Sequence, residues 1–534
     1  MSKVPLILNK SRRRDAALVV LMGVGQAIAM GVGIFATRDA FSSLHGGGKP
    51  GIWSLGLLLL AGFAVAGLQM ASRIRAEAIG QSFAKSLRRV LYRQIAGMSD
   101  AERSQLREGA LSLRFVGDLS AARGWAGPGL TRLASAGIVL PGAAMSLYLM
   151  SATLALAGMI PILLSVTVSI GLAVGLTNYH RDLRSHRARI AISMMERLRI
   201  SGALDLAGRT RREIKSLDES STRVAKDAVN RMTRLSLLRS LPQWGAAVGG
   251  AAVLWATGEF GLPPAEAAAA LALLTVLVLP LHQLTDVWDR YCAWRIAKLK
   301  CERLLRHDSQ LRRIEARTAP VPITFEGVEF RGMQMELHIP AGACVQISGA
   351  AGSWKSAFLS LVAGQNRPDK GHVSYGENDN LPRIAYVSDV PLVVHGSLRR
   401  NLTLGGRRRP PDETLVDCLQ HFGLAALLDR IGGLDGRVHE HGRTLSSGEV
   451  LRIELARTVV TEPDLIVIDS AQFSADSSSE NLIARLRSKC RATLVFSGSS
   501  SISYRDVAVL RLNDPKANAI GADVESQCKL HAAA

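Results

Sequence analysis

Long stretches without a charged side chain occupy much of the first half of the chain and limit what it can fold into. Five such stretches lie within residues 16–285, and the longest, residues 133–179, contains about 47 residues. A helix needs about 20 apolar residues to cross a bilayer, so the longest stretch provides two spans, with a tight turn expected near residues 154–158. A single stretch has a buried core helix as its alternative, but no soluble core of this size needs six uncharged helices. The sequence therefore predicts six spans, at residues 16–37, 50–72, 133–154, 156–179, 241–258 and 267–285.

The basic residues indicate how these spans are oriented. The chain has 65 Lys and Arg against 45 Asp and Glu, a formal net charge of +20. Nucleic-acid binding is one explanation of such an excess, but the loops 38–49 and 259–266 hold only Arg38 and Lys49, whereas residues 73–132 and 178–240 hold 11 and 15 basic residues. Positive loops stay in the cytoplasm. We therefore expect a multi-pass protein of the cytoplasmic (inner or plasma) membrane with both termini in the cytoplasm, and no nucleic-acid partner.

The two basic segments have the charge spacing of helices that continue from a span into water, turn and return. At about 1.5 Å per residue, 25 helical residues reach nearly 40 Å beyond the membrane, which is far enough to contact a cytoplasmic domain.

The composition changes after residue 313. Short β-type runs such as ITFEGVEF, CVQISG, RIAYVS, LIVIDS and ATLVFSG alternate with helical segments, a pattern typical of an α/β domain with a partly parallel sheet. We predict a helical membrane domain at 1–313, an α/β domain at 320–515 and a tail at 516–534. Six cysteines form no CxxC pair and are expected to be reduced thiols rather than metal ligands; they are Cys292, Cys301, Cys344, Cys418, Cys490 and Cys528.

A glycine-rich segment in the second domain has the order of a phosphate-binding loop. The strand CVQISG leads into GAAGSWKS, with a helix after it, as in the pattern GxxxxGK[ST]. Lys355 is placed to reach the β- and γ-phosphates of a nucleotide, and the Ser356 hydroxyl to ligate Mg²⁺. Trp354 replaces the second glycine, where a Cβ hinders the approach of backbone N–H groups to phosphate. Alone, the segment also fits a chance glycine-rich turn.

Two further motifs follow at a distance. DLIVID ends in Asp469, which is placed to hold Mg²⁺ through water, as in a Walker B strand. Before it, LSSGE opens a helix, so that Ser446 and backbone N–H groups face an anion at a helix N-terminus.

With these motifs in place, nearly the whole chain resembles one half of an ABC transporter of the exporter type. LSSGEVLRIELAR followed by PDLIVID resembles the signature motif, its helix and Walker B; ISGAAGSWKS resembles Walker A; and RIAYVSDVPLVVHGSLRRNLTLG resembles the Q-loop region. The resemblance implies that nucleotide is bound by Gly349, Gly352, Ser353, Lys355, Ser356, Ala357 and Asp469, with Mg²⁺ on Ser356 and Asp469. It also implies that the signature residues Ser446, Ser447, Gly448 and Glu449 act on the site of a second half.

Several positions depart from the family pattern. Asp389 stands at the Q-loop glutamine, Ser470 at the glutamate that serves as general base, and Gly498 at the switch histidine, while Asp476 keeps the D-loop aspartate. Ala357 replaces the usual threonine, Ser447 and Glu449 replace glycine and glutamine, and no adenine-stacking aromatic lies near Gly332. Because a serine cannot accept a proton from water as a carboxylate does, and general bases contribute about 10²–10⁴-fold, we expect this chain's own site to hydrolyse ATP weakly or not at all.

The resemblance implies a dimer whose two sites each combine the Walker motifs of one half with the signature motif of the other. In a homodimer both sites carry every defect, whereas in a heterodimer the intact-looking LSSGE motif serves a competent partner, and this arrangement is favoured. Coupling helices are expected near residues 98–108 and 200–210. The uncharged spans disfavour an ion-coupled carrier, and the cargo stays open among peptide, lipid and drug. The alternatives are a scaffold or regulatory subunit that does not transport, and a membrane-bound P-loop kinase, which the signature motif disfavours.

Overall fold

The computed structural model describes residues 4–173, 175–307, 314, 320–349, 354–376, 381–406, 409–476, 478–498, 504 and 507–511. The chain divides into a helical unit, residues 1–96 and 105–309, and an α/β unit, residues 97–104 and 310–534. The division near residue 310 lies close to the predicted one, but residues 97–104 join the α/β unit. The predicted tail 516–534 lies outside the described residues.

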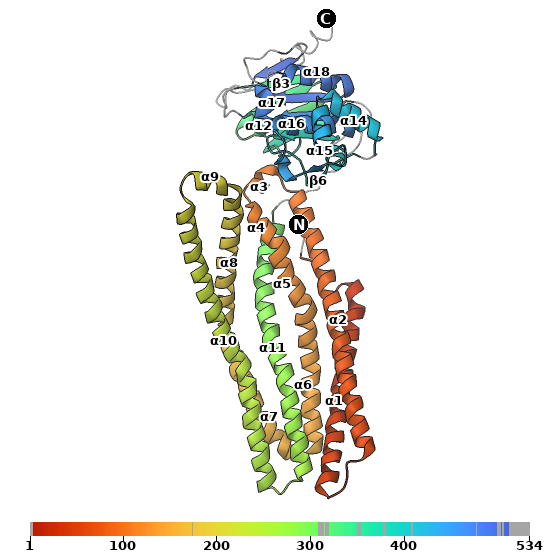
Figure 1. Cartoon of the computed structure of the whole chain (residues 1–534), viewed down its shortest axis with the longest axis vertical. Helices are drawn as coiled ribbons and strands as arrows, with labels where there is room; N and C mark the ends of the chain where they lie inside the picture. Colours follow the sequence, from red (N-terminus) through yellow and green to blue (C-terminus); the bar gives the residue numbers. More distant parts are fainter. Residues whose placement is uncertain are drawn as a thin grey trace. The chain divides into compact units, whose positions relative to one another are not determined.

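The helical unit is built from long helices that lie side by side (Figure 1). Two short π-helical segments, η1 (Arg114–Asp118) and η2 (Trp125–Gly129), connect helices in the later part of the first basic segment, residues 73–132. The α-helices of this unit are α1 (Lys10–His45), α2 (Ile52–Ala96), α4 (Glu108–Leu113), α5 (Leu119–Gly124), α6 (Leu130–Met150), α7 (Ala152–Ala173), α8 (Leu176–Arg199), α9 (Ser201–Leu206), α10 (Thr210–Glu259) and α11 (Pro264–Leu305).

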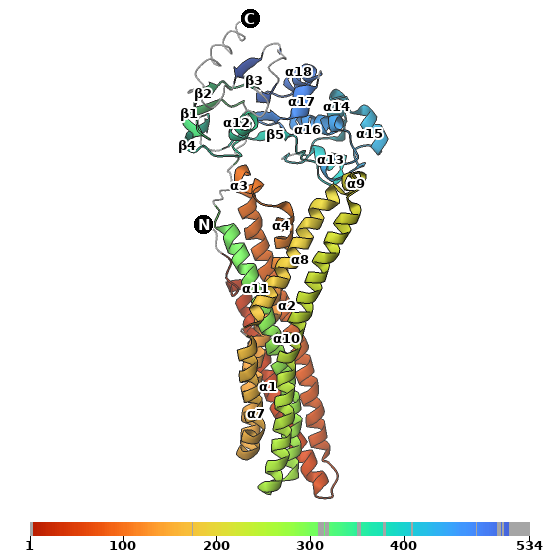
Figure 2. The same ribbon diagram turned by 90° about the vertical axis from the view of Figure 1, so that its left-hand side faces the viewer.

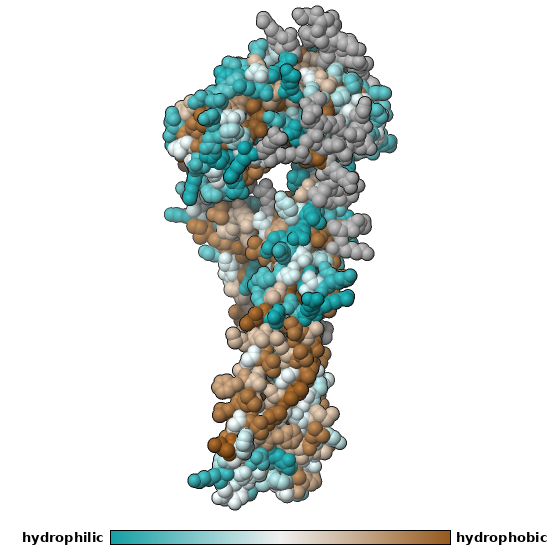
Figure 3. All heavy atoms as spheres, turned by 90° about the vertical axis from the view of Figure 1, so that its right-hand side faces the viewer, coloured by the Kyte–Doolittle hydropathy of each residue, from teal (hydrophilic) through white to brown (hydrophobic). Residues whose placement is uncertain are grey.

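Within the described residues, five segments are long and apolar enough to cross a membrane. They contain the predicted spans 16–37 and 267–285 and all but the first two residues of 50–72, together with α6 and α7. Figure 3 shows a broad band of apolar side chains across the lower part of this unit, with hydrophilic side chains at its lower tip and above the band.

The predicted span 241–258 lies in α10, which is not among these five. Glycines in this span bring the α10 backbone against α7. A Cβ at Gly249 would lie 2.6 Å from the carbonyl oxygen of Gly158, and one at Gly245 would lie 2.5 Å from Ser165 Oγ. Small residues of this kind let membrane helices approach closely. The sixth span therefore remains a prediction from charge and position.

The turn expected near residues 154–158 is misplaced. α6 ends at Met150 and α7 begins at Ala152, so the chain reverses at Ser151, which has an extended backbone. Residues 133–179 are uniformly apolar, so the sequence pattern does not show where the chain reverses. In the structure, the Ser151 hydroxyl accepts from the Leu154 amide at 3.4 Å, in the first turn of α7.

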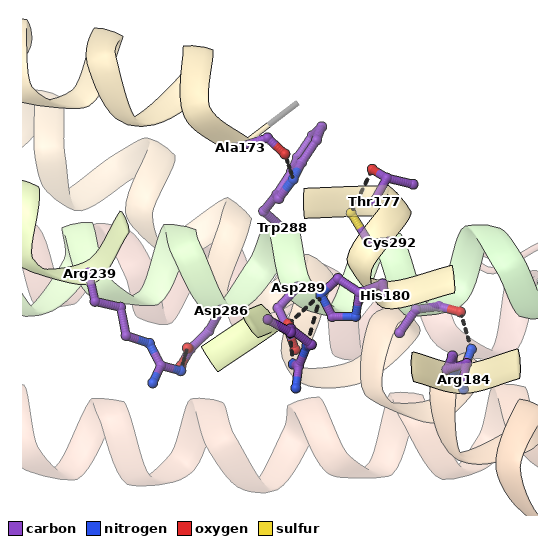
Figure 4. Close-up of polar contacts among 11 residues, drawn as sticks. Ala173, Thr177, His180, Arg184, Arg239, Asp286, Trp288, Asp289 and Cys292 are labelled. Atoms are coloured by element: carbon purple, nitrogen blue, oxygen red, sulfur yellow. Dashed lines mark hydrogen bonds and ion pairs between the residues drawn. The ribbon is translucent and has the colours of Figure 1, made fainter. Parts of the chain in front are cut away.

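Polar contacts join α11 to α8 and α10, the helices of the second basic segment, residues 178–240 (Figure 4). Asp289 lies 2.7 Å from His180 Nε2 and 2.5 Å from Arg231 Nη2, which joins α11 to α8 and α10. The Trp288 indole nitrogen donates to the Ala173 carbonyl at 3.0 Å. These contacts fix the rotational setting of α11 at the end of its predicted span.

The α/β unit contains a parallel sheet of five strands in the order β10-β3-β9-β8-β5 and an antiparallel sheet in the order β2-β1-β4. Its strands are β1 (Ile323–Phe330), β2 (Met333–Ile339), β3 (Cys344–Ser348), β4 (Lys370–Tyr375), β5 (Ile384–Ser388), β6 (Gly396–Ser397), β7 (Arg437–Val438), β8 (Leu465–Asp469), β9 (Thr493–Ser497) and β10 (Ala508–Arg511). Its helices are α3 (Asp100–Ser104), α12 (Lys355–Val362), α13 (Leu398–Leu402), α14 (Asp412–His421), α15 (Ala425–Ile431), the 3₁₀-helix η3 (Glu440–Gly442), α16 (Ser447–Thr461), α17 (Ala471–Ala475) and α18 (Ser479–Lys489).

The predicted α/β class and the partly parallel sheet are confirmed, and all five predicted β-runs form strands. β3, β8 and β9 lie at the centre, where β3 and β9 are buried along their whole length. Helices lie close to this sheet in Figure 2. Because all five strands are parallel, their carboxyl ends meet at one edge of the sheet, where α/β domains place ligands.

Candidate functional site

The predicted Walker A segment lies between the buried strand β3 and the helix α12. Gly349 follows β3, and Lys355 is the first residue of α12. Two predicted nucleotide-binding residues, Gly352 and Ser353, lie outside the described residues. Ala357 is partly buried and packs against the core around β1 and β3.

Trp354 directly precedes α12, and its indole ring lies beside the β1–β2 turn. The guanidinium carbon of Arg331 is 5.9 Å from the centre of this ring and 5.5 Å from the ring of Phe330. Both distances fall within the cation–π range. Arg331 is the residue before Gly332, the position near which no adenine-stacking aromatic was found in the sequence. Trp354, which departs from the family pattern, thus lies against the residue next to the position where the stacking aromatic is missing.

The Walker A serine and the Walker B aspartate meet at the carboxyl edge of the sheet. The Ser356 hydroxyl donates to Asp469 Oδ1 at 2.9 Å, and the Tyr386 hydroxyl donates to Asp469 Oδ2 at 3.1 Å. Burial raises the pKa of Asp469, a change that the Ser356 and Tyr386 hydrogen bonds and the Lys355 charge oppose. Burial, with the Asp469 charge, also raises the pKa of Tyr386. No sequence motif identified Tyr386, which reaches this site from the middle of β5.

These oxygens fit a Mg²⁺ ion that arrives with a nucleotide. Mg²⁺ is commonly held by one or two carboxylates, with phosphates and waters completing its shell. Ser356 and Asp469 supply two hard oxygen ligands side by side. In the part of the chain that the structure describes, no three His, Cys, Asp or Glu side chains gather as a metal site. For a Mg²⁺ ion bound here, the protein would supply a minority of the ligands, and phosphate and water oxygens would supply the rest.

The residues at the Q-loop and general-base positions are bonded to each other. The Ser470 hydroxyl donates to Asp389 Oδ1 at 2.8 Å, and the backbone N–H of Ala471 donates to the same oxygen at 2.9 Å. Ser470 also accepts from the Phe473 amide at 3.3 Å and so caps α17. Asp389 therefore binds the N-terminus of a helix, a stabilising position for an anion.

The switch position is filled by a side chain from a neighbouring strand. Gly498 follows β9, and its N–H donates to the carbonyl of Ile347 at 3.0 Å. A Cβ at Gly498 would lie 2.4 Å from Nε2 and 2.6 Å from Cγ of Gln346, a side chain of β3 that is 1% exposed. The space beside residue 498 is thus occupied by Gln346, which sequence spacing did not identify.

The signature segment forms a complete capping box. Ser446 Oγ accepts from the Glu449 amide at 3.2 Å, and Glu449 Oε2 accepts from the Ser446 amide at 2.8 Å. Arg430 Nη2 also donates to Glu449 at 3.0 Å. Although burial acts in the opposite direction, the Ser446 amide and Arg430 lower the pKa of Glu449. Ser447 and Gly448 form the first turn of α16, and a Cβ at Gly448 would have only Gln472 near it, at 3.9 Å.

The D-loop aspartate and the two coupling helices remain predictions, and the structure describes their residues. Asp476 ends α17 and accepts from the amide and hydroxyl of Ser478, at 2.8 and 2.7 Å. The short helix α3, which belongs to the α/β unit, lies within the predicted coupling range 98–108; in this unit Asp100 N–H donates to the Gln365 carbonyl, and Ala101 N–H to Asn366 Oδ1, both at 3.2 Å. In the helical unit, α9 lies within the range 200–210 predicted for the second coupling helix.

The α/β unit matches a known sequence family. Residues 333–472 match the family described as ABC transporter. The chain is 33% identical over 143 residues to an uncharacterized ABC transporter ATP-binding protein of Haemophilus influenzae, covering 25% of each chain. It is 28% identical over 226 residues to an ATP-dependent lipid A-core flippase of Thiobacillus denitrificans, covering 39% of each chain. The chain thus spans well under half the length of these curated relatives.

A solved structure extends the likeness of fold to the helical unit. A bacterial Atm1-family ABC exporter with ATP bound superposes with a TM-score of 0.77 at 20% identity, over 95% of this chain and 94% of that one. The family match, the motif geometry and this fold lead to one conclusion. The α/β domain matches the ABC transporter family over residues 333–472, and the chain as a whole has the fold of an ABC exporter half, a helical domain followed by one α/β domain.

Proposed function

We propose that this chain is an export subunit of the cytoplasmic membrane that dimerises with a second ABC half and works through ATP and Mg²⁺ bound between the two nucleotide-binding domains. The fold and the family match support the ABC architecture. The charge distribution supports a topology with both termini and the nucleotide-binding domain in the cytoplasm. Relatives are named for lipid A-core flipping and for multidrug resistance, so export of an amphipathic compound is the proposed activity.

We propose further that the site built on this chain's own Walker motifs is catalytically weak. The observation that carries this proposal is the hydrogen bond from Ser470 to Asp389. A serine hydroxyl does not accept a proton from water near neutral pH, and the neighbouring carboxylate oxygen already accepts two hydrogen bonds. Gln346 occupies the space beside the switch position. Two groups that ordinarily position and deprotonate water are thus replaced by a capping contact and an amide.

The same chain keeps a well-formed signature helix, and this favours a heterodimer. The capping box of Ser446 and Glu449 leaves the N-terminus of α16 ordered, with the helix dipole available to an anion. In this proposal α16 completes the nucleotide site of a partner with intact Walker motifs. A homodimer is the alternative assembly, with both sites weak.

The test begins with ATP turnover by the purified chain in lipid, with Lys355→Ala as its control. The proposal expects no turnover above the control. Turnover near 1 s⁻¹, modest for an enzyme, that Lys355→Ala abolishes would contradict the weak-site proposal and favour a homodimeric exporter.

A second experiment reconstitutes the chain with a competent ABC half from the same source. Turnover by the pair that changes when Ser447 or Glu449 is substituted supports action in trans. A pair that forms and hydrolyses ATP without responding to either substitution contradicts it. A chain that assembles but supports neither turnover nor transport is the scaffold or regulatory subunit considered above.

A further inference from the structure

Two histidine side chains lie next to each other on a short β-ribbon of the α/β unit. The strands β6 and β7 pair antiparallel, with Gly396 opposite Val438. Continuing this register by one residue places His395 opposite His439. Residues directly opposite each other on an antiparallel pair have Cβ atoms about 4.5–5.5 Å apart. The ribbon therefore brings together two imidazoles that are far apart in the chain, and the sequence motifs did not connect them.

The geometry of the two rings suits a shared metal ion. The ring centres of His395 and His439 are 5.7 Å apart, and the ring planes are inclined by 53°. A histidine nitrogen binds Zn²⁺ at about 2.0–2.1 Å, so two imidazoles on one tetrahedral ion have their ring centres about 5.2 Å apart. The observed separation is slightly larger than this value, and rotation about the side-chain bonds closes the difference.

Both imidazoles are available to an ion from water. The two side chains are exposed, and His439 has an extended backbone, with φ −81° and ψ 157°. The Arg400 guanidinium donates to the His395 carbonyl at 3.5 Å, and the His439 carbonyl accepts from the Gly442 amide at 3.1 Å. These contacts use the backbone. In the part of the chain that the structure describes, neither imidazole has a hydrogen-bonding partner, so each ring offers a nitrogen lone pair.

The ribbon itself is short, and a cross-link would stabilise it. β6 and β7 contain two residues each, and an isolated two-stranded ribbon is marginally stable at best. One backbone bond continues the pairing, from the Leu398 N–H to the Gly436 carbonyl at 3.0 Å. The ribbon joins the segment that follows Asp389 to the segment that precedes Ser446. An ion bound to both rings would therefore hold together the segments that flank the Q-loop position and the signature helix.

We propose that His395 and His439 form a two-histidine site for a divalent transition-metal ion such as Zn²⁺ or Cu²⁺. Imidazole is a suitable ligand for these ions, with Cu²⁺ bound more tightly than Zn²⁺, whereas Mg²⁺ prefers carboxylate and water oxygens. The two rings supply the protein ligands, and water completes the shell. The ion stabilises the ribbon because it binds the native pairing and not the unfolded chain. This site requires neither nucleotide nor a second subunit.

The first test measures Zn²⁺ binding to the full chain in nanodiscs, without a histidine tag and without nucleotide. Isothermal titration should show one saturable site per chain, for which excess Mg²⁺ does not compete. Competition by Mg²⁺ would indicate an oxygen-rich site and would overturn the proposal. The chain loaded with equimolar Cu²⁺ should show electron paramagnetic resonance splitting from two imidazole nitrogens. Splitting from one ring, or from none, would also overturn it.

Variants test the two ligands. His395→Ala and His439→Ala should each lower the Zn²⁺ affinity at least about tenfold, since loss of even an outer-shell partner of a metal ligand costs about 10–100-fold. His439→Cys supplies another zinc ligand and should recover much of the affinity that His439→Ala loses. His338→Ala is the matched control, because His338 is also exposed on a strand of the α/β unit and bonds to Thr324 Oγ1 at 3.0 Å.

Melting experiments separate loss of the ligand from misfolding. Without metal, the alanine variants should melt with the parent chain. Zn²⁺ at a hundred times its Kd should raise the melting midpoint of the parent α/β domain by about 5–10 °C, and that of neither alanine variant. Unchanged Zn²⁺ affinity in both alanine variants, or an equal loss in His338→Ala, would refute the assignment. Because nucleotide is absent throughout, neither outcome depends on the proposed export function or on the turnover experiment.

Discussion

The hydroxyl of Ser470 donates a 2.8 Å hydrogen bond to Asp389, so the residues at the presumed general-base and Q-loop positions hold each other. Restoring a carboxylate at residue 470 alone would place it beside Asp389, and two adjacent carboxylates cannot both ionise readily. We expect Ser470→Glu to add little ATP turnover, whereas Ser470→Glu with Asp389→Gln raises it at least about tenfold, toward the lower end of general-base contributions.

Steady-state phosphate release by the chain in lipid measures this difference. Asp389→Gln alone is the control, and it should stay inactive because no base is present. A single Ser470→Glu variant as active as the double variant would show that Asp389 does not oppose the new carboxylate.

The contact between Gly498 and Gln346 makes a second prediction. A side chain at residue 498 meets Gln346 Nε2 at 2.4 Å, and overpacking a buried site costs about 1–3 kcal/mol. We expect Gly498→His to lower the thermal midpoint of the nucleotide-binding domain, and Gln346→Ala in the same chain to recover part of the loss. Fluorescence-detected melting of both variants measures the effect. A Gly498→His chain that melts with the parent would mean that Gln346 moves away without cost.

The capping box predicts different effects for two changes at Glu449. Glu449→Gln keeps an acceptor for the Ser446 amide and should preserve the helix start, whereas Glu449→Ala removes it, at about 1 kcal/mol for a lost cap interaction. Arg430→Ala is the matched control: it removes only a partly exposed ion pair with Glu449, so its effect should be small. Hydrogen exchange in the first turn of α16 reports the difference. Equal protection in the Ala and Gln variants would contradict the capping role.

The raised pKa of Asp469, which burial causes, predicts two opposite pH dependences. A carboxyl whose pKa is higher in the folded than in the unfolded state adds stability below its unfolded pKa and loses that addition as pH rises through the folded pKa. Relative to Asp469→Asn, the parent should therefore gain stability as pH falls from the raised value toward 3.8. Mg²⁺-dependent nucleotide binding needs the ionised carboxylate and should fall over the same interval. Melting and nucleotide titrations at matched pH check both, and parallel trends would contradict the assignment.

The close approach of α7 and α10 predicts a glycine-specific effect in the helical unit. A Cβ at Gly249 would lie 2.6 Å from the Gly158 carbonyl oxygen, whereas one at Gly258 would meet nothing within 4 Å. Gly249→Ala should therefore lower the melting temperature of the chain in detergent, with a cost of about 1–3 kcal/mol for overpacking, and Gly258→Ala should leave it unchanged. Similar melting of both variants would show that the two helices separate easily.

The sequence alone determined the fold class and the order of the domains, because each rests on local regularities. Charge-free runs that are long enough to cross a bilayer as helices can be recognised from adjacent residues alone. The same is true of the five β-runs, such as residues 465–469. The same holds for the motifs around Lys355, Ser446 and Asp469, whose spacing matches the family. The turn at Ser151 was missed because the residues on both sides of it are equally apolar.

The tertiary structure decided what fills each altered position, because those contacts join residues remote in the chain. Tyr386 reaches Asp469 from another strand, Gln346 fills the space beside Gly498, and Asp389 binds Ser470 across 81 positions. Motif spacing shows at which position this chain lacks the residue that the family has. Only the packing of strands and helices against one another shows which side chain occupies the space there.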